Sequence, residues 1–325
     1  MTPFLRFRPR FRYAAQHTGF MSDSCRVDEV KERGATVVQQ PKASAEKGAS
    51  DEMVRAETAF AERRIANRHP ARKIDIMAEY YWPRVTFGEK GHRMDIGDNR
   101  YLFYRRHLDH LKEFSGKHVL NVACGPGRLS LYLAHQGMTV AAFDISPASV
   151  QYAREFAEIN GYGDAIDVQV MDIRSLTYPD DAFDVVTGEA ALHHLIKYEG
   201  CLENMYRVLK PGGVALFWES FDFDPLIRFL RPINWRRRGY VGEYMLGASD
   251  LHHAREVFDE VLISDQSVFY TYSRFFRKPT PLNRRVARLL KRVDDMLLPR
   301  LPFLMRHYSL AYMQMKKRST APLPT

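Results

Sequence analysis

The amino-acid sequence predicts an α/β fold in which a mostly parallel sheet carries helices on both faces. Along residues 117–219, short apolar runs rich in β-branched residues alternate with segments of helical periodicity, the pattern of successive βα units. One predicted strand is followed by a Cys-Gly-Pro-Gly turn, and two others end in aspartate. Sheets of this kind bind ligands at the carboxyl ends of their strands, so we expect the functional site there.

The first unit is Lys117–Ala134, and its strand, Val119–Val122, is apolar enough for the buried centre of a parallel sheet. In the turn that follows, Gly125 and Gly127 lack a Cβ, so the backbone can turn sharply and lie against a ligand. The N–H groups that open the next helix, from Leu129 onward, would then face a polar or anionic group. Ordinary βα turns share these features, so the units that follow decide the interpretation.

Four further strands follow at regular spacing. Val140–Asp144 and Val168–Asp172 each end in an acid, and Ser146 between them is a helix N-cap followed by proline. Phe183–Thr187 runs into the sequence GEAALHHL, and Val208–Glu219 combines a helix end, a Pro-Gly-Gly turn and a fifth strand. Together the five units predict one continuous sheet.

The C-terminal third adds two predicted strands, Val257–Ser264 and His307–Met315, separated by a helical insertion at residues 265–306. In the insertion, apolar residues at helical spacing lie opposite charged ones; the apolar set is Val286, Leu289, Leu290, Val293 and Leu297. A basic amphipathic helix of this type lies on a membrane surface in some proteins. We expect a lid packed on its own domain and leave surface contact by residues 284–298 open.

Composition sets outer bounds on the function. The chain has 325 residues, of which 45% are hydrophobic, as is usual for a globular protein with a hydrophobic core. Its formal net charge of +9 makes anionic partners plausible. Its three cysteines are too few for a disulfide framework or a zinc site, and we predict no metal. Because no apolar run is as long as a membrane span, we expect a soluble, cytoplasmic protein. We expect it to be a monomer or a homodimer.

The N-terminal region divides into two parts. Residues 1–50 are a predicted flexible basic tail and linker, and Met21 is an alternative start that would make residues 1–20 untranslated. Residues 51–116 are a predicted helical cap, with one helix from Ser50 through Asn67 and many aromatic residues after Ile74.

The ordered motifs of residues 118–219 resemble those of class I S-adenosylmethionine-dependent methyltransferases, particularly the small-molecule branch of type-11 and quinone-biosynthesis enzymes. The resemblance implies a Rossmann-like, seven-stranded, doubly wound sheet with an antiparallel last strand between the fifth and sixth. It also implies a cofactor-binding core at 117–264, a helical lid at 265–306, a final strand at 307–316 and a tail at 317–325.

The same resemblance implies how S-adenosylmethionine is held. Asp144 takes the position of the acid that accepts hydrogen bonds from both ribose hydroxyls, and Asp172 with the N–H of Ile173 takes that of the adenine-reading pair. The backbone of the glycine turn would carry the methionyl group, and residues 189–191 would pass beside the sulfonium. The predicted cofactor-binding residues are Asn121, Ala123, Cys124, Gly125, Gly127, Asp144, Ile145, Asp172, Ile173, Glu189, Ala190, Tyr81 and Tyr101.

Asn121 and the two tyrosines differ from the other predicted cofactor-binding residues. The family usually has Asp or Glu where this chain has Asn121, an acid that helps to hold the cofactor's ammonium; asparagine keeps the size and one acceptor but loses the charge. We expect weaker binding or a shifted methionyl group. Tyr81 and Tyr101 could face the sulfonium through cation–π attraction, although core packing of the cap is the simpler interpretation for aromatic residues.

Candidate catalytic residues follow from the need for a general base when the nucleophile arrives protonated. His193, His194 and Glu189 follow the fourth strand, and Glu219 ends the fifth. A hydrogen-bonded structural role is the competing interpretation for either histidine, because the sequence LHH is common at this point in similar chains.

The acceptor is predicted to be a small molecule, since no nucleic-acid-binding module and no Asn/Asp-Pro-Pro-aromatic motif is present. Arginines between Phe221 and Gly247 could bind a substrate carboxylate or phosphate, or simply be solvated. A dinucleotide oxidoreductase is disfavoured because Ser130 stands where its third small residue is needed. Two alternatives stay open: an enzyme of this fold that displaces a group within S-adenosylmethionine, such as an azetidine-type cyclase releasing methylthioadenosine, and a non-catalytic cofactor-binding or membrane-surface module.

Overall fold

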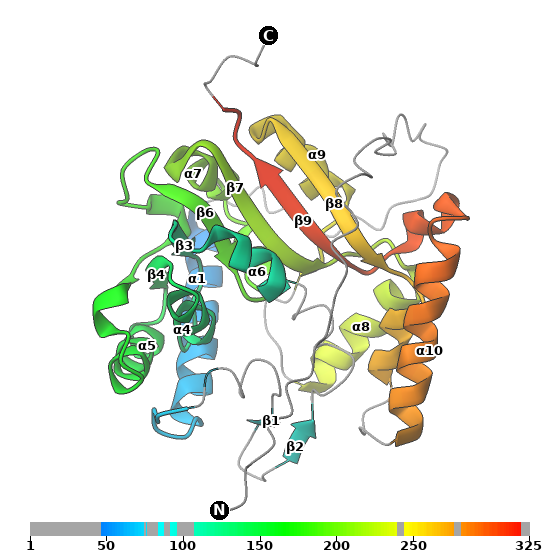
Figure 1. The fold of residues 1–325 in the computed structure, drawn as a ribbon, viewed down its shortest axis with the longest axis horizontal. Coiled ribbons are helices and arrows are strands. Elements are labelled where there is room, and N and C mark those ends of the chain that lie inside the picture. Colours follow the sequence, from blue (N-terminus) through cyan, green and yellow to red (C-terminus); the bar gives the residue numbers. More distant parts are fainter. Residues whose placement is uncertain are drawn as a thin grey trace, which may run out of the picture. The chain divides into compact units, whose positions relative to one another are not determined.

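The structure is a computed structural model that describes residues 47–74, 76, 84–87, 92–95, 107–238, 244–275 and 281–319. Its central feature is a seven-stranded sheet in the order β5-β4-β3-β6-β7-β9-β8 (Figure 1). The strands are β3 (His118–Asn121), β4 (Thr139–Asp144), β5 (Ile166–Val170), β6 (Phe183–Gly188), β7 (Leu209–Ser220), β8 (Glu260–Ser267) and β9 (Leu310–Lys316). β9 pairs antiparallel with both β7 and β8, which confirms the predicted fold and the place of the last strand.

Helices cover both faces of the sheet, as the alternating pattern predicted. They are α4 (Arg128–His135), α5 (Pro147–Ile159), α6 (Leu192–Leu195), α7 (Cys201–Val208), α8 (Pro225–Arg238), α9 (Ala248–Val257) and α10 (Pro281–Leu297). Successive residues of β3 enter different cores, because Val119 packs with α4 and α5 whereas Leu120 packs with α7 and α9. Both side chains are fully buried, as expected for a strand at the centre of a parallel sheet.

The local signals of the sequence appear where they were expected. Ser146 caps α5, its hydroxyl accepting the N–H of Ser149 at 3.2 Å, and Pro147 is the first helical residue. β5 ends at Val170, so Asp172 lies two residues beyond the strand and instead caps a short 3₁₀ helix, η3 (Ile173–Ser175). The strand therefore begins and ends two residues earlier than predicted, but its acid still follows its carboxyl end.

The region predicted as a helical cap contains helix α1 (Lys47–Ala66), which contacts α5. It also contains a two-stranded antiparallel sheet that the sequence did not suggest, formed by β1 (Arg84–Phe87) and β2 (His92–Asp95). Of the predicted flexible tail and linker at 1–50, residues 1–46 lie outside the described residues, and residues 47–50 are not linker but the first residues of α1. No helix in the described ranges is both long and apolar enough to cross a membrane.

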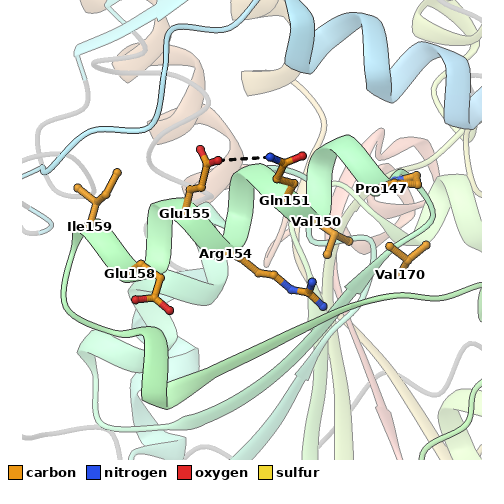
Figure 2. Close-up of a pocket in the computed structure, with 8 residues that line it drawn as sticks. All are labelled: Pro147, Val150, Gln151, Arg154, Glu155, Glu158, Ile159 and Val170. Carbon is orange, nitrogen blue, oxygen red and sulfur yellow. Dashed lines mark hydrogen bonds between the residues drawn. The ribbon is translucent and has the colours of Figure 1, made fainter.

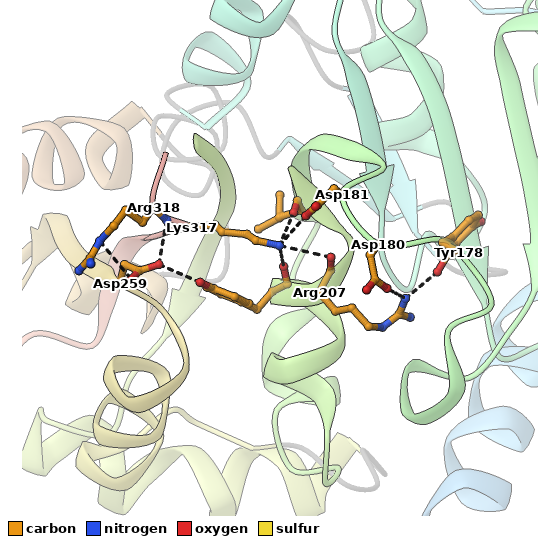
Figure 3. A network of polar contacts seen from close by, with 9 residues as sticks. Tyr178, Asp180, Asp181, Arg207, Asp259, Lys317 and Arg318 are labelled. Carbon is orange, nitrogen blue, oxygen red and sulfur yellow. Dashed lines mark hydrogen bonds and ion pairs between the residues drawn. The ribbon is translucent and has the colours of Figure 1, made fainter. Parts of the chain in front are cut away.

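A polar network fastens the C-terminal end of β9 to the amino ends of β6 and β7 (Figure 3). The ammonium of Lys317 donates to Asp181 at 2.7 Å and to the carbonyl oxygens of Leu209 at 2.8 Å and Tyr206 at 3.1 Å. A cation at these carbonyls complements the negative end of the α7 dipole. The network lies at the amino ends of β6 and β7. The candidate site lies at the opposite end of the sheet, where the parallel strands have their carboxyl ends.

Candidate functional site

The turn after β3 is built from left-handed backbone. Gly125 has φ +53°, and a Cβ on it would meet nothing within 4 Å, so this position faces open space. Gly127 has φ +76°, and its added Cβ would lie 2.8 Å from that of Ala153 on α5. Gly127 therefore lets α4 begin close to α5, whereas Gly125 leaves the turn open. Ala123, at φ +47°, is a strained non-glycine residue of the kind that gathers at functional sites.

Asp144 ends the neighbouring strand, β4, and its carboxylate holds two loops together. Oδ2 accepts the N–H of Gly125 at 2.8 Å and Oδ1 accepts the N–H of Ser146 at 2.9 Å. Burial raises the pKa of Asp144, although these two N–H groups act in the opposite direction. Each oxygen keeps a further acceptor position, so the carboxylate can also accept two hydroxyl groups of a vicinal diol.

Asp172 lies beyond the next strand and is engaged by Arg174. The carboxylate accepts the N–H of Arg174 at 2.9 Å and its guanidinium Nη2 at 2.7 Å. Nη1 of the same guanidinium donates to Asp51 of α1 at 2.8 Å. The side chain of Asp172 is one-fifth exposed and can still accept a ligand donor. The adjacent Ile173 is buried.

Asn121, at the end of β3, carries an acceptor that has no hydrogen-bond partner in the described part of the chain. Its Nδ2 donates to the hydroxyl of Ser130 at 2.8 Å, while Oδ1 is buried and unsatisfied. A buried polar atom without a partner is costly, and a donor supplied by a ligand would remove that cost. This orphaned oxygen fits the predicted contact with an ammonium group.

The remaining predicted residues lie in the loops that follow β3, β4 and β6. The N–H of Cys124 bonds the carbonyl oxygen of Phe143 at 2.9 Å, so it is already used between β3 and β4. Ile145 is half-buried beside Asp144. After β6, Glu189 and Ala190 are exposed, and Ala190 adopts φ +49°, the second strained alanine at this edge.

His193 and Glu219 form a buried pair at the ends of β6 and β7. Nδ1 of His193 lies 2.6 Å from Oε2 of Glu219, whose Oε1 accepts the N–H of Leu192 at 2.8 Å. An ionised carboxylate only accepts hydrogen bonds, so beside ionised Glu219 the neutral ring carries its proton on Nδ1, and Nε2 is then its basic nitrogen. This pair matches the arrangement of a general base oriented by an acid.

His194 turns the other way, toward α1. Its Nδ1 lies 3.2 Å from the carboxylate of Glu57, which also accepts the ammonium of Lys197 at 2.5 Å. Burial alone would raise the pKa of Glu57, but His194 and Lys197 outweigh it and lower that pKa. Besides burial, the charge of Glu57 raises the pKa of Asp144 and that of His194 lowers it.

The structure thus places Asn121, the glycine turn, Asp144 and Asp172 along the carboxyl ends of the adjacent strands β3, β4 and β5. The pair of His193 and Glu219 lies at the ends of the next two strands, β6 and β7. Tyr81 and Tyr101 lie outside the described residues. Sequence reasoning missed Glu57, Lys197 and Arg174, because their partners are distant in the chain and no local pattern marks them. For the arginine-rich segment 221–247, the structure shows helix α8 and an exposed Arg228.

A separate groove of about 610 Å³ runs along α5 and the edge strand β5 (Figure 2). Three of the four polar side chains that line it already pair within the fold: Gln151 bonds Glu155 at 3.5 Å, and Nε of Arg154 donates to the carbonyl of Val168 at 2.8 Å. Figure 2 shows the aliphatic side chains of Val150, Ile159 and Val170 along it. It lacks the strand-end acids and is not the candidate site.

Comparison with known proteins agrees with the site's position. Residues 120–217 match a family model described as a methyltransferase domain. The chain is 36% identical over 125 residues to a demethylmenaquinone methyltransferase of Symbiobacterium thermophilum, covering 37% of this chain and 50% of that protein. It is 33% identical over 112 residues to a ubiquinone biosynthesis O-methyltransferase of Coxiella burnetii, covering 34% of this chain and 47% of that protein. The chain spans about half the length of these curated relatives.

Among solved structures, the cyclase SpnF aligns with a TM-score of 0.50 and 18% identity, covering 82% of this chain and 97% of that one. At this identity the likeness concerns the fold alone.

Proposed function

We propose that this chain, of which residues 120–217 match a methyltransferase domain, is a class I S-adenosylmethionine-dependent methyltransferase of the type-11 branch that methylates an oxygen, nitrogen or carbon of a small molecule. The observation that carries the proposal is the buried carboxylate of Asp144, fixed by two backbone N–H groups beside the glycine turn. That arrangement offers two remaining acceptor positions to a ribose diol.

Asp144 would bind the ribose, and Asp172 with the N–H of Ile173 would bind the adenine. The orphaned Oδ1 of Asn121 would accept the ammonium of the methionyl group, and the open side of Gly125 would admit the chain leading to it. S-adenosylmethionine supplies an electrophilic methyl carbon when bound. The protein then contributes alignment, which is worth about 7–11 kcal/mol in favourable cases.

Helix α1 would close over the carboxyl ends of β3, β4 and β5 as part of the cap at 51–116. Its Asp51 reaches Arg174 beside the adenine-reading acid, and its Glu57 reaches His194 and Lys197 beside the sulfonium segment. Excluding water in this way strengthens the electrostatic contacts inside. The helical insertion at 265–306 would complete the substrate cavity as a lid.

The pair of His193 and Glu219 favours an acceptor whose nucleophile arrives with a proton, such as a hydroxyl. Nε2 of His193 would remove that proton as the methyl group is transferred, and Glu219 would stabilise the resulting imidazolium. General-base catalysis of this kind contributes about 10²–10⁴-fold. One relative acts as an O-methyltransferase in ubiquinone biosynthesis, which supports a hydroxyl-bearing acceptor. A carbon nucleophile would need this base less.

The test is incubation with S-adenosylmethionine and a panel of hydroxylated aromatic acceptors, followed by chromatography of the nucleoside product. S-adenosylhomocysteine formed in step with a methylated acceptor supports the proposal. Methylthioadenosine as the product would indicate displacement within the cofactor instead. Tight cofactor binding without any product across the panel and a metabolite extract would indicate a non-catalytic module.

A further inference from the structure

The outer face of α10 carries large apolar side chains that the fold leaves uncovered. Nine large hydrophobic side chains are exposed in the described part of the chain, and five of them lie between residues 282 and 303. These five are Leu282, Leu289, Met296, Leu301 and Phe303. The sequence pattern placed Leu289 on the packing face of this helix, but its side chain is 59% exposed.

The spacing of the first three makes them one stripe. Leu282, Leu289 and Met296 follow one another at seven-residue intervals, so each lies nearly above the last on a helix of 3.6 residues per turn. We call these three residues the α10 stripe. A regular stripe along the helix differs from apolar residues scattered singly over a surface, which need no explanation.

The opposite face of α10 holds the helix in a fixed orientation. The buried carboxylate of Asp294 accepts the backbone N–H groups of Phe269 at 2.8 Å and Tyr270 at 2.9 Å, and Ala287 is fully buried. Leu289 lies two residues beyond Ala287, and Met296 lies two residues beyond Asp294, which is a rotation of about 200° around the helix in each case. The α10 stripe therefore points away from its own domain.

Positive charge borders the stripe. Arg285, Arg288 and Arg292 are exposed, and none of them forms an ion pair with an acidic residue in the described ranges, whereas Lys291 pairs with Asp295. Residues 281–307 contain seven Lys or Arg and only two Asp. An apolar stripe beside arginines is the pattern of a helix that lies in the plane of a bilayer interface.

We propose that α10 docks this protein on an anionic lipid surface, with the α10 stripe among the acyl chains and Arg285, Arg288 and Arg292 at the headgroups. Charge complementarity selects this occupant, because a second copy of the chain would bring the same arginines together and nucleic acid would leave the stripe uncovered. Leu301 and Phe303, just beyond the helix, extend the apolar contact. The helix rests on the membrane without crossing it, and the inference does not depend on methyl transfer.

The test is sedimentation of the full chain with vesicles of phosphatidylcholine, alone or with about one third phosphatidylglycerol. Binding is expected to the anionic vesicles only, falling steeply between about 0.05 M and about 0.5 M salt as the arginines are screened. No sedimentation with anionic vesicles at low salt would overturn the proposal.

Two variants assign the contact. Leu289→Ser with Met296→Ser should weaken binding about tenfold or more by removing the inserted side chains. Arg285→Gln with Arg288→Gln should flatten the salt dependence. The matched control is Ile159→Ser with Val170→Ser, which removes two exposed apolar side chains from the α5 groove and should bind as the parent does. Unchanged binding of the stripe variant, with far-UV circular dichroism confirming its fold, would contradict the proposal, as would an equal loss in the control. Loss of self-association in the stripe variant with vesicle binding intact would assign the stripe to a second copy instead.

Discussion

Replacing Glu219 by glutamine removes the charge that faces His193 while keeping the size and planarity of the side chain. The parent carboxylate accepts two hydrogen bonds, from Nδ1 of His193 at 2.6 Å and from the N–H of Leu192 at 2.8 Å. Glutamine has one acceptor oxygen and one NH₂ group, so it can satisfy only one of these donors.

The glutamine can be oriented in two ways: one predicts a loss of turnover and the other a loss of stability. If the amide oxygen accepts the N–H of Leu192, the NH₂ group faces Nδ1 of His193. The imidazole proton then moves to Nε2, which can no longer act as the base. Turnover should then fall by about 10²–10⁴, the size of general-base catalysis, with little change in KM or cofactor affinity. If the oxygen keeps His193, the buried N–H of Leu192 loses its partner at a cost of about 1–3 kcal/mol in unfolding free energy.

The assay is steady-state turnover of Glu219→Gln as a function of pH, beside urea unfolding of the same protein. The control is His194→Gln, which alters the neighbouring ring but leaves the His193 pair intact and should reduce turnover far less. Partial recovery in Glu219→Asp would show that the charge itself is needed. A Glu219→Gln protein with turnover within about threefold of the parent and unchanged stability would refute the role assigned to the pair.

Two further predictions concern stability. Burial, with a smaller contribution from His110, lowers the pKa of His107 from 6.5 to about 3, so the unfolded state takes up this proton first as the pH falls. Unfolding free energy should drop by about 1.4 kcal/mol per pH unit from about pH 6.5 down to about pH 3, and His107→Gln should flatten that part of the urea-unfolding profile. Gly127→Ala combines a left-handed φ of +76° with a contact of 2.8 Å to Ala153, and should cost about 1–3 kcal/mol in unfolding free energy. Gly125→Ala, which meets open space, should cost less by the same measurement; equal losses would contradict the packing argument.

Much of the fold could be predicted because its signals are local. The strand at Val119–Val122 has apolar residues on both faces beside its one polar residue, Asn121. Ser146 and the proline after it mark the start of α5, and Asp144 directly ends its strand. Each of these patterns lies within a few residues, so a single sequence contains it. The antiparallel place of the last strand came instead from the family resemblance, and the pairing of β9 confirms it.

The contacts of α1 could not be predicted for the opposite reason. Glu57 meets Lys197 across 140 residues, and Asp51 meets Arg174 across 123. Charged residues on a polar helix carry no sign of which distant group they will pair with, since their periodicity is that of any solvated face.

Helix α10 shows a different limit of sequence reasoning. Its apolar residues spread around more of the helix than its domain covers, so periodicity identified the helix but placed Leu289 on the wrong side. The burial of Asp294, a charged residue, could not be read from the pattern either. Its place is set by the free N–H groups of Phe269 and Tyr270, which only the folded chain brings to it.

The carboxylate of Asp144 is the central cofactor ligand in the proposed site, and calorimetric titration with S-adenosylhomocysteine tests that role. Asp144→Asn should lower affinity by about 10²–10⁴, because it removes two charge-assisted hydrogen bonds worth about 1.5–3 kcal/mol each. Binding to the parent protein should also weaken as the pH falls toward the raised pKa of Asp144. A folded Asp144→Asn protein that binds within about threefold of the parent would contradict the central claim.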